Sequence, residues 1–530
     1  MNKDDINSIN ELGQEIQILI GKGLLNKAEK MITRLPLESA SIKFNVGGFY
    51  IDIGVRKSDK KMVNKGIDLI KEVYNLNLSQ QMEIPKSEIY YNLANGYSSL
   101  FSIDVSRNNV RVILPFDYLN KAKKYYLEAI KHIDENVDSS LVTQIYVNYG
   151  NCLDSIGRHI EAIEAYENAL NITPDYPMAI GNKGMCLVRL ASNSGEYNFQ
   201  IYNVAYQLIQ KAINSELNDK AAKQHFQLES DSILKKIGKS NLIRNNLIGE
   251  KHEQRHETHN FKDYYSNFCL KNRLFLNSHG FYCKCDDGIG DPLAILKLIL
   301  PVTDEVKPHI LSSYLNQLKQ EYVAARYLFV ESQYKNEDLK AIDAKVIIVD
   351  TLDYSLNNIY LELLKSSFRI VYGVLDKIAL FLNEYLELGN SVSKVGYKNI
   401  WYSKLDYNKG ISNKLSGVKN YALLALYDIR RDLIYKDDDP SLSDIRNSLE
   451  HRFIKIVLKN FNRNKIVAEY QDDILFFDEE ILVERTLELF KLVRSAIIYL
   501  VNVVYLEENK KDNQDLPTIF GIELPDNLKY

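Results

Sequence analysis

Apolar residues recur every three to four positions along most of the chain, which is the spacing that gathers them on one face of an α-helix. Towards the C-terminus this spacing predicts five long helices, at about residues 309–335, 352–389, 416–435, 441–461 and 478–507. The short apolar run 346–349 is predicted to be a brief strand or an extended connection. We therefore expect an all-α chain in which residues 309–510 form a helical bundle and 511–530 a tail.

The N-terminal half contains a repeat of about 34 residues, clearest at 143–176. Its first helix is expected to carry Tyr146, Gly150 and Leu153, and its second helix to end at a proline, Pro174. Small residues at Gly150, and at Ala162 and Ala169 on either side of Tyr166, would let the two helices approach closely. This pattern closely resembles a tetratricopeptide repeat.

Further copies of the repeat lie on both sides of this unit. One begins at Pro177, one spans the region from Leu93 to Ala129, and weaker copies lie around Gly47 with Gly66 and around Ala28. We interpret residues 1–235 as a degenerate helical solenoid, whose inner face would bind a peptide or another protein. A role as a scaffold or dimerisation arm is the alternative.

Composition narrows the class of protein. The chain has 530 residues, of which 45% are hydrophobic and 26% charged, and this composition is ordinary for a globular protein of two or more domains. The formal net charge of −4 argues against a protein coated in nucleic acid. Five cysteines, no hydrophobic N-terminal segment and no apolar run of membrane-spanning length predict a cytoplasmic protein without a membrane partner.

Residues 236–308 are expected to connect the two halves, and they hold a cluster of histidines and cysteines. His252 and His256 are one helical turn apart, and Cys283 and Cys285 follow; all four are candidate zinc ligands. The paired C-x-x-C knuckles of common zinc sites are missing, so we favour a polar helix followed by buried free cysteines. The expectation is that no metal or other cofactor is bound.

The fourth predicted helix carries the most informative motif, Arg446-Asn447-x-x-x-His451. A histidine can move a proton near neutral pH, and an arginine can hold a phosphate as its charge develops, so this pair can cleave RNA without a metal. Ser441 or Ser443 is expected to cap the helix, with Asp444 in its first turn.

The helix geometry has consequences for this motif. Ile445, Leu449, Phe453 and Ile456 would form the buried stripe of the helix, with His451 pointing away from it. Arg446 and His451 would lie about 140° apart around the axis, which is awkward for gripping one phosphate. Two copies of the helix meeting across a symmetric interface would solve this. Asn447, one turn before His451, could orient the imidazole.

The alternative is a surface ion pair between Arg446 and Glu450 beside an exposed histidine. Basic residues around the motif favour an RNA site instead, because residues 446–465 and residues 394–419 each carry a net charge of +5. Lysines alternating with aromatic rings suit phosphate contacts and base stacking, although a solvated lysine-rich loop is equally compatible. The candidate RNA-binding residues are Lys398, Trp401, Tyr402, Lys404, Arg452 and Lys455.

The five-helix pattern with Arg446-Asn447-x-x-x-His451 in a late helix resembles the HEPN superfamily, which includes metal-independent endoribonucleases of bacterial toxin, antiphage and stress systems. The resemblance implies a homodimer in which His451 is general acid or base, Arg446 stabilises the scissile phosphate and Asn447 positions it. The implied products end in 2′,3′-cyclic phosphates. Glu450 departs from this picture by placing a negative charge near the phosphate, and some HEPN domains have lost catalysis.

Two hypotheses follow. The first is an HEPN-type endoribonuclease restrained by a repeat domain until a signal arrives, in antiphage defence or toxin-like growth arrest. The second is a non-catalytic dimeric adaptor or RNA-binding protein that uses its repeats for protein interaction. The sequence contains no G-x-x-x-x-G-K-[ST], no G-x-S-x-G and no H-E-x-x-H, so other common enzyme classes have no support.

Overall fold

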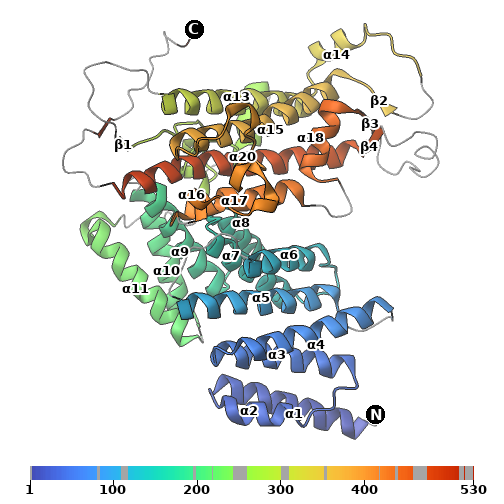
Figure 1. Cartoon of the computed structure of the whole chain (residues 1–530), viewed down its shortest axis with the longest axis vertical. Coiled ribbons are helices and arrows are strands. Elements are labelled where there is room, and N and C mark those ends of the chain that lie inside the picture. Colours follow the sequence, from blue (N-terminus) through green and yellow to red (C-terminus); the bar gives the residue numbers. More distant parts are fainter. Residues whose placement is uncertain are drawn as a thin grey trace. The chain divides into compact units, whose positions relative to one another are not determined.

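The computed structural model describes residues 3–79, 84–108, 117–194, 199–217, 219–242, 260–299, 310–350, 355–416, 418–435, 440–457, 474–511, 518–519 and 529. The chain divides into two compact units. The first contains residues 1–188 and 205–242, and the second contains residues 189–204 and 243–530. Figure 1 labels the helices and strands.

The first unit is a succession of helix hairpins, as expected for a tetratricopeptide-like solenoid. Helices α3 and α4, α5 and α6, and α7 and α8 form the hairpins, and α4 with α5 and α6 with α7 pack neighbouring hairpins together. The last parts of α9 and the first part of α10 belong to the second unit. The helices are α1 (Lys3–Gly21), α2 (Leu25–Ile32), α3 (Ala40–Arg56), α4 (Lys60–Ser79), α5 (Lys86–Asn108), α6 (Asp117–Lys131), α7 (Ser139–Ile156), α8 (His159–Ile172), α9 (Pro177–Ser194), α10 (Phe199–Asn214), α11 (Lys220–Ile237) and the 3₁₀ turn η1 (Lys239–Asn241).

Glycines set how closely the paired helices approach. A Cβ atom on Gly150 of α7 would lie 2.5 Å from the ring of Tyr166 on α8, so the tyrosine fits only because the side chain opposite it is missing. The weaker copy of the repeat follows the same rule. A Cβ on Gly66 of α4 would lie 2.5 Å from the carbonyl oxygen of Gly47 on α3. The prediction that a small residue at Gly150 lets the two helices approach closely is confirmed.

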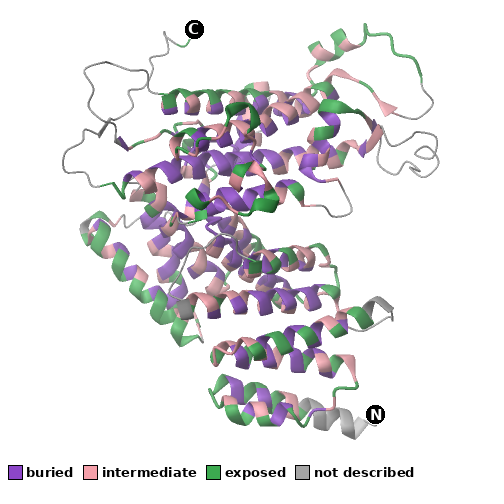
Figure 2. Cartoon of the chain, in the orientation of Figure 1, coloured by how far each residue is buried: buried purple, intermediate pink, exposed green. Residues whose placement is uncertain are grey.

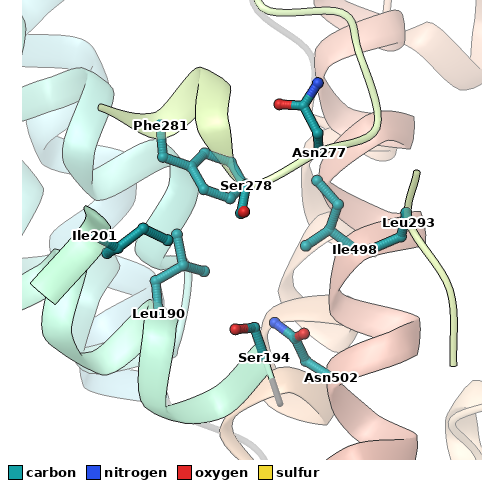
Figure 3. Close-up of a pocket in the computed structure, with 9 residues that line it drawn as sticks. All are labelled: Leu190, Ser194, Ile201, Asn277, Ser278, Phe281, Leu293, Ile498 and Asn502. Atoms are coloured by element: carbon teal, nitrogen blue, oxygen red, sulfur yellow. The ribbon is translucent and has the colours of Figure 1, made fainter. Parts of the chain in front are cut away.

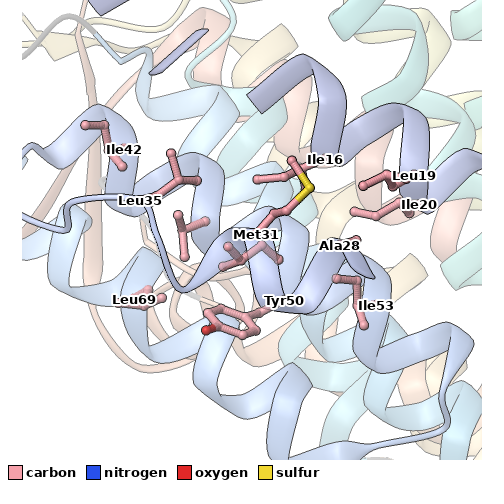
Figure 4. Packing of buried hydrophobic residues seen from close by; sticks show 12 residues of the cluster. Ile16, Leu19, Ile20, Ala28, Met31, Leu35, Ile42, Tyr50, Ile53 and Leu69 are labelled. Carbon is pink, nitrogen blue, oxygen red and sulfur yellow. The ribbon is translucent and has the colours of Figure 1, made fainter. Parts of the chain in front are cut away.

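The most degenerate repeat still forms a core. Ala28 and Ile32 of α2 are buried together with apolar side chains from α1, α3 and α4 (Figure 4). Met31 and Tyr50 fill the space between these helices. The first hairpin is therefore held by ordinary apolar burial, even though its sequence retains little of the repeat pattern.

The second unit is a helical bundle with two small sheets. Its helices after residue 243 are α12 (Phe261–Lys271), α13 (Ile310–Tyr334), α14 (Glu337–Asp343), α15 (Ile359–Tyr385), α16 (Asn413–Ser416), α17 (Tyr421–Ile434), α18 (Leu442–His451) and α20 (Glu479–Glu508), with 3₁₀ turns η2 (His279–Phe281), η3 (Asp286–Gly288), η4 (Val392–Lys394), η5 (Ser403–Leu405) and η6 (Tyr407–Lys409). β1 (Leu298–Ile299) pairs antiparallel with β5 (Thr518–Ile519). In the other sheet, β3 (Phe453–Val457) lies between β2 (Ser355–Leu356), antiparallel to it, and β4 (Ile474–Asp478), parallel to it.

Helix α20 is the centre of the bundle, and α13, α15 and α17 all pack against it. Figure 2 shows that it is buried along most of its length. Its length and composition would allow it to cross a membrane, which corrects the expectation that the chain has no apolar run of that size. However, 83% of its most apolar window is buried inside the structure, as is typical of a central core helix.

The segment before the bundle is bonded to it through buried polar groups. Arg326 of α13 is 1% exposed, and its guanidinium forms a two-point ion pair with Asp291, with Nη1–Oδ1 at 2.9 Å and Nη2–Oδ2 at 2.7 Å. The same side chain donates to the Leu274 carbonyl at 2.8 Å and to the Tyr265 hydroxyl at 2.7 Å. Residues 260–299 are therefore packed against α13 and are not a loose linker.

The helices predicted at 309–335, 416–435 and 478–507 match α13, α17 and α20 closely. The helix predicted at 352–389 corresponds to α15, but it begins only at Ile359 because the strand β2 precedes it, and the predicted helix 441–461 is half wrong. It ends at His451, and the chain continues as strand β3. The apolar run 346–349 is an extended connection with exposed side chains, and the short strand β2 lies after it. The all-α fold class is confirmed, with these small sheets as additions.

The close approach at Gly66 gives a stability prediction. Gly66→Ala should destabilise the first unit by about 1–3 kcal/mol, because the new methyl group would press on backbone that cannot rotate away. Gly48→Ala, in α3, is the matched control, since its Cβ would meet only the Asn92 amide at 3.8 Å. That change should be neutral or stabilising by up to about 1 kcal/mol. Urea unfolding followed by circular dichroism measures both, and equal stability of the two variants would contradict the packing argument.

Candidate functional site

Helix α18 begins with a complete capping box, which fixes the positions of the residues that follow. The Ser441 hydroxyl accepts a hydrogen bond from the Asp444 amide at 3.1 Å, and the Asp444 carboxylate accepts one from the Ser441 amide at 3.3 Å. Two amide donors that helix geometry leaves unpaired are thereby satisfied. Of the two serines considered as caps, Ser441 is the one used, and Asp444 lies in the first turn as expected.

The buried face of α18 is shorter than the sequence suggested. Ile445 and Leu449 are buried, but Phe453 is 77% exposed because the helix has already ended. Ile456 is buried as part of strand β3, not of the helix. The predicted four-residue stripe is therefore wrong beyond Leu449. The stretch from Leu442 to His451 is helical as predicted.

Arg446 is half-buried and makes no ion pair among the residues described. Its Nη1 atom donates to the Asn447 side-chain oxygen at 3.4 Å, and its guanidinium lies 5.9 Å from the centre of the Tyr372 ring on α15. The alternative interpretation, an ion pair with Glu450, is not found. A guanidinium with spare donors remains available to an anionic ligand.

His451 is the last residue of α18, and its side chain is exposed. In the part of the chain that the structure describes, its imidazole has no hydrogen-bond or ion-pair partner. The Asn447 amide, which we expected could orient this imidazole, faces Arg446 instead. The helix carries Arg446 and His451 five positions apart, so a single copy presents them on different sides of the helix.

Lys398 is brought to this helix from a distant part of the sequence. Its Nζ atom donates to the Ser443 hydroxyl at 2.7 Å, in the first turn of α18. The lysine is exposed, so its ammonium lies at the surface on the side where the helix begins. Of the residues predicted to contact RNA, Lys398 is therefore hydrogen-bonded to the helix that carries Arg446.

Tyr372 is a member of this site that the sequence did not suggest. It is buried, and burial raises the pKa of its hydroxyl, a shift that the Ser443 hydroxyl and Arg446 oppose. The tyrosine stays neutral and supplies a flat surface beside the Arg446 guanidinium. Its only signal in the sequence is its place on the apolar stripe of a long helix, which does not distinguish it from core.

The two aromatic residues predicted to stack on bases do not lie at the surface. Trp401 is 0% exposed and Tyr402 4% exposed. The Trp401 indole donates to the Tyr397 carbonyl at 2.7 Å, and its ring packs against Tyr427 of α17. No base can reach these rings in this structure, so the prediction of base stacking on Trp401 and Tyr402 is wrong.

A buried arginine explains why Tyr402 turns inwards. Arg430 of α17 is 7% exposed, and its guanidinium lies 5.1 Å from the Tyr402 ring centre, 5.6 Å from that of Tyr427 and 5.9 Å from that of Tyr407. Cation–π attraction to these three rings stabilises the buried guanidinium. The loop that contains Tyr402 is thus fixed from within, and its lysines are left outside.

The remaining basic candidates are spread over different elements. Lys404 is exposed in the loop before α16, Arg452 is exposed and caps the C-terminus of α18, and Lys455 is half-buried in β3. The basic residues between 458 and 465 lie outside the described residues. Lys398 and Arg452 therefore lie at opposite ends of α18, with Arg446 between them.

A second candidate site lies in the first unit. A groove of about 410 Å³ is lined mainly by α3, α5 and α7, the first helix of each of three successive hairpins. Side-chain amides of Asn95, Asn148 and Asn151 line it, with Asp52 and Arg56 at one side. Amides can bond to the backbone of any peptide, because each offers both a donor and an acceptor. The inner face of the repeats is therefore polar and suited to an extended peptide.

The predicted metal candidates are only partly brought together. Cys283 and Cys285 lie close to each other and to His279, whereas His252 and His256 lie outside the described residues. Cys269, on α12, is buried, and burial raises the pKa of its thiol to about 12. In the first unit, His159 is held by Asp154 at 2.9 Å inside the repeat core and serves packing.

Comparison with known proteins agrees with this arrangement. Residues 302–507 match the family described as LA2681-like HEPN, and residues 143–176 match the tetratricopeptide repeat. No curated protein matches the chain. Solved structures do match, among them one titled "Crystal structure of MamA protein". It is 21% identical to this chain, the match covers 40% of this chain and 96% of that one, and the TM-score is 0.26. The chain therefore contains a tetratricopeptide repeat in its first unit and, near its C-terminus, a domain that matches the LA2681-like HEPN family.

Proposed function

We propose that the protein is a metal-independent endoribonuclease of the HEPN type whose activity is controlled through its repeats. The observation that carries the proposal is the state of α18: Arg446 and His451 are both accessible, and neither is engaged by a carboxylate among the described residues. In a purely structural helix, an arginine one turn from Glu450 would be expected to pair with it. Here the ion pair is absent and a lysine from another loop joins the same helix.

The chemistry needs only this chain's side chains. His451 takes the proton of the ribose 2′-hydroxyl as that oxygen attacks the adjacent phosphorus, or returns a proton to the 5′-oxygen as it leaves. Arg446 holds the non-bridging oxygens as negative charge builds up on them, and Asn447 keeps its guanidinium in place. The bond to the 5′-oxygen breaks, which leaves a 2′,3′-cyclic phosphate and a 5′-hydroxyl.

The separation of Arg446 and His451 on one helix supports a homodimer as the active form. Residues five positions apart on a helix face different directions, so one phosphate is gripped most easily by the arginine of one copy and the histidine of the other. In this proposal the paired α18 helices line one cleft, and Lys398 and Arg452 extend its positive charge along the RNA. The protein acts in the cytoplasm, in antiphage defence or toxin-like growth arrest.

The repeats supply control. The asparagine-lined groove of the first unit fits a peptide or protein segment, and binding or release there would set whether the nuclease acts. A non-catalytic adaptor would use the same groove, so the groove alone does not separate the two hypotheses. The cleavage of RNA distinguishes the nuclease from the adaptor.

The nuclease is tested with purified protein on total RNA and on tRNA in the presence of EDTA. Wild type should cleave and leave cyclic phosphate ends, and His451→Ala and Arg446→Ala should each lower the rate by about 10²–10⁴-fold, because each removes a group that acts on the reacting phosphate. Arg446→Lys should fall in between, since lysine keeps the charge but loses the two-point geometry.

The matched control is His225→Ala, which removes an exposed histidine on α11 of the first unit and should leave the rate unchanged. Circular dichroism establishes that every variant is folded. Equal cleavage by wild type and His451→Ala would exclude this histidine from the reaction. A requirement for magnesium would contradict the metal-independent mechanism. Growth of the expression host gives a second readout, because both active-site variants should relieve any toxicity of the wild type.

RNA binding is tested in a His451→Ala background so that the ligand stays intact. Lys398→Gln should weaken binding to single-stranded RNA and lower the slope of log K against log salt by about 0.7, the contribution of one phosphate contact. Lys340→Gln, an exposed lysine on α14, is the control and should change neither quantity. Trp401→Phe should lower stability but not affinity, because the ring is buried. Loss of affinity in Trp401→Phe at full stability would restore the base-stacking interpretation.

Control by the repeats is tested with Ser102→Arg, which places a long charged side chain in the groove, against Ser106→Arg, one turn further along α5 and outside the groove lining. Both residues are exposed, so both variants should fold. We expect the purified proteins to cleave RNA equally, while RNA cleavage in cells changes in Ser102→Arg alone. Identical behaviour of the two variants in cells would remove the groove from regulation.

A further inference from the structure

Residues 277–290 form a compact loop, here called the Cys/His loop, in which three metal-binding side chains converge. The Nε2 atom of His279 and the Sγ atoms of Cys283 and Cys285 all lie within 4.8 Å of one another, and Nε2 is 2.9 Å from the Cys285 sulfur. Two thiolates and one imidazole are a common ligand set for zinc. The sequence analysis named both cysteines as candidate ligands together with His252 and His256, which lie outside the described residues.

The imidazole is already oriented as a ligand. The Tyr282 hydroxyl donates to the Gln200 side-chain oxygen at 2.6 Å, and it also lies 3.0 Å from Nδ1 of His279. A phenol has one proton to donate, so it accepts the Nδ1 proton of the histidine. That leaves Nε2 with a lone pair directed at the cysteines. A hydrogen bond to the far nitrogen is the usual way in which proteins orient a metal-binding histidine.

Hydrogen bonds between the Asn277 side chain and the backbone hold the Cys/His loop together, and Cys283 and Cys285 are free cysteines. The Asn277 amide donates to the carbonyls of Gly288 and Gly290, both at 2.8 Å, and accepts from the Gly280 amide at 3.0 Å. The loop is thereby closed at its base by one side chain. Gly288 packs against His279, where a Cβ atom would lie 3.2 Å from the ring. The donor atoms are therefore arranged before any ligand binds.

The Cys/His loop is also anchored to the bundle. The Arg494 guanidinium of α20 lies 4.8 Å from the Phe281 ring centre and donates to the Phe275 carbonyl at 3.1 Å. Figure 3 shows Asn277 and Phe281 at a small pocket whose other walls include Ile201 and Ile498, from α10 and α20. The loop thus lies where the ends of α9 and α10 meet the central helix of the second unit.

We propose that His279, Cys283 and Cys285 bind one Zn²⁺ ion, which stabilises the Cys/His loop and its contacts with α10 and α20. In a tetrahedral site the donor atoms are roughly 3.3–3.8 Å apart, so the His279–Cys285 distance would lengthen by about half an ångström. A water molecule completes the coordination. Both thiols bind as thiolates, and their two protons are released to solvent. The ion is structural and does not take part in RNA cleavage, so the proposal does not rest on the proposed function.

The first measurement is the metal content of untagged protein purified without chelator. Wild type should carry about one zinc per chain. Cys283→Ser/Cys285→Ser and His279→Ala should lose it, whereas Cys269→Ala, which removes a cysteine outside the loop, should keep it. Tyr282→Phe should weaken zinc binding by about ten-fold while leaving all three ligands in place, because it removes the hydrogen bond that orients His279 together with the one to Gln200.

A second measurement does not depend on how the cysteine variants fold. Metal-stripped wild type titrated with Co²⁺ should develop thiolate-to-cobalt absorption and a higher melting temperature, and added Zn²⁺ should abolish the absorption. Substoichiometric zinc together with no cobalt spectrum would overturn the proposal. A mass lower by two hydrogens, with Cys283 and Cys285 joined in one peptide, would also overturn it, since it would identify the pair as a disulfide.

Discussion

The second unit depends on a buried ion pair. Burial by itself would lower the pKa of Arg326, but the hydrogen bonds and charge of Asp291 outweigh burial and raise it, so the guanidinium stays charged inside the protein. Two desolvated charges are tolerated only when nearly every donor and acceptor is satisfied, and here the Leu274 carbonyl and the Tyr265 hydroxyl take the remaining bonds. The pair fixes residues 274–291 against α13. The Cys/His loop, whose base leads directly into Asp291, takes its position from this contact.

Much of this architecture could be predicted from the sequence because it is locally encoded. The tetratricopeptide-like hairpins follow from small residues such as Gly150 and Gly66, whose partners lie within the same repeat. Four long helices of the HEPN domain follow from apolar periodicity alone. The prediction failed after His451, where Phe453 and Ile456 fit a helical stripe equally well. Their strand is specified by pairing with β4, whose first residue lies about twenty positions further along the chain, and such a partner leaves no local signal.

For single residues of the candidate site, too, the sequence predicts only what is encoded locally. Arg446 and His451 could be singled out because they lie on one helix in a recognisable spacing. Alternating lysines and aromatic rings around Trp401 could not reveal which side chains point inwards, because that is decided by Arg430 on a helix some thirty positions away. Tyr372 was missed because it lies on the apolar stripe of a long helix, where the sequence does not distinguish it from a core residue. His279 was missed as a partner of Cys283 because the loop that joins them is closed by Asn277, a residue with no pattern of its own.

His451 stands at the point where helix α18 passes into strand β3, and this has a consequence for how the site can be adjusted. Strand β3 lies parallel to β4, and β4 runs without interruption into the central helix α20. The backbone at His451 is therefore held on two sides: by the helix that precedes it and, through one pair of strands, by the core of the domain. In the proposed nuclease, substitutions in β4 or at the start of α20 would shift the backbone at His451 while every residue of the motif stays the same. The proposed site could thus be adjusted from positions outside the motif.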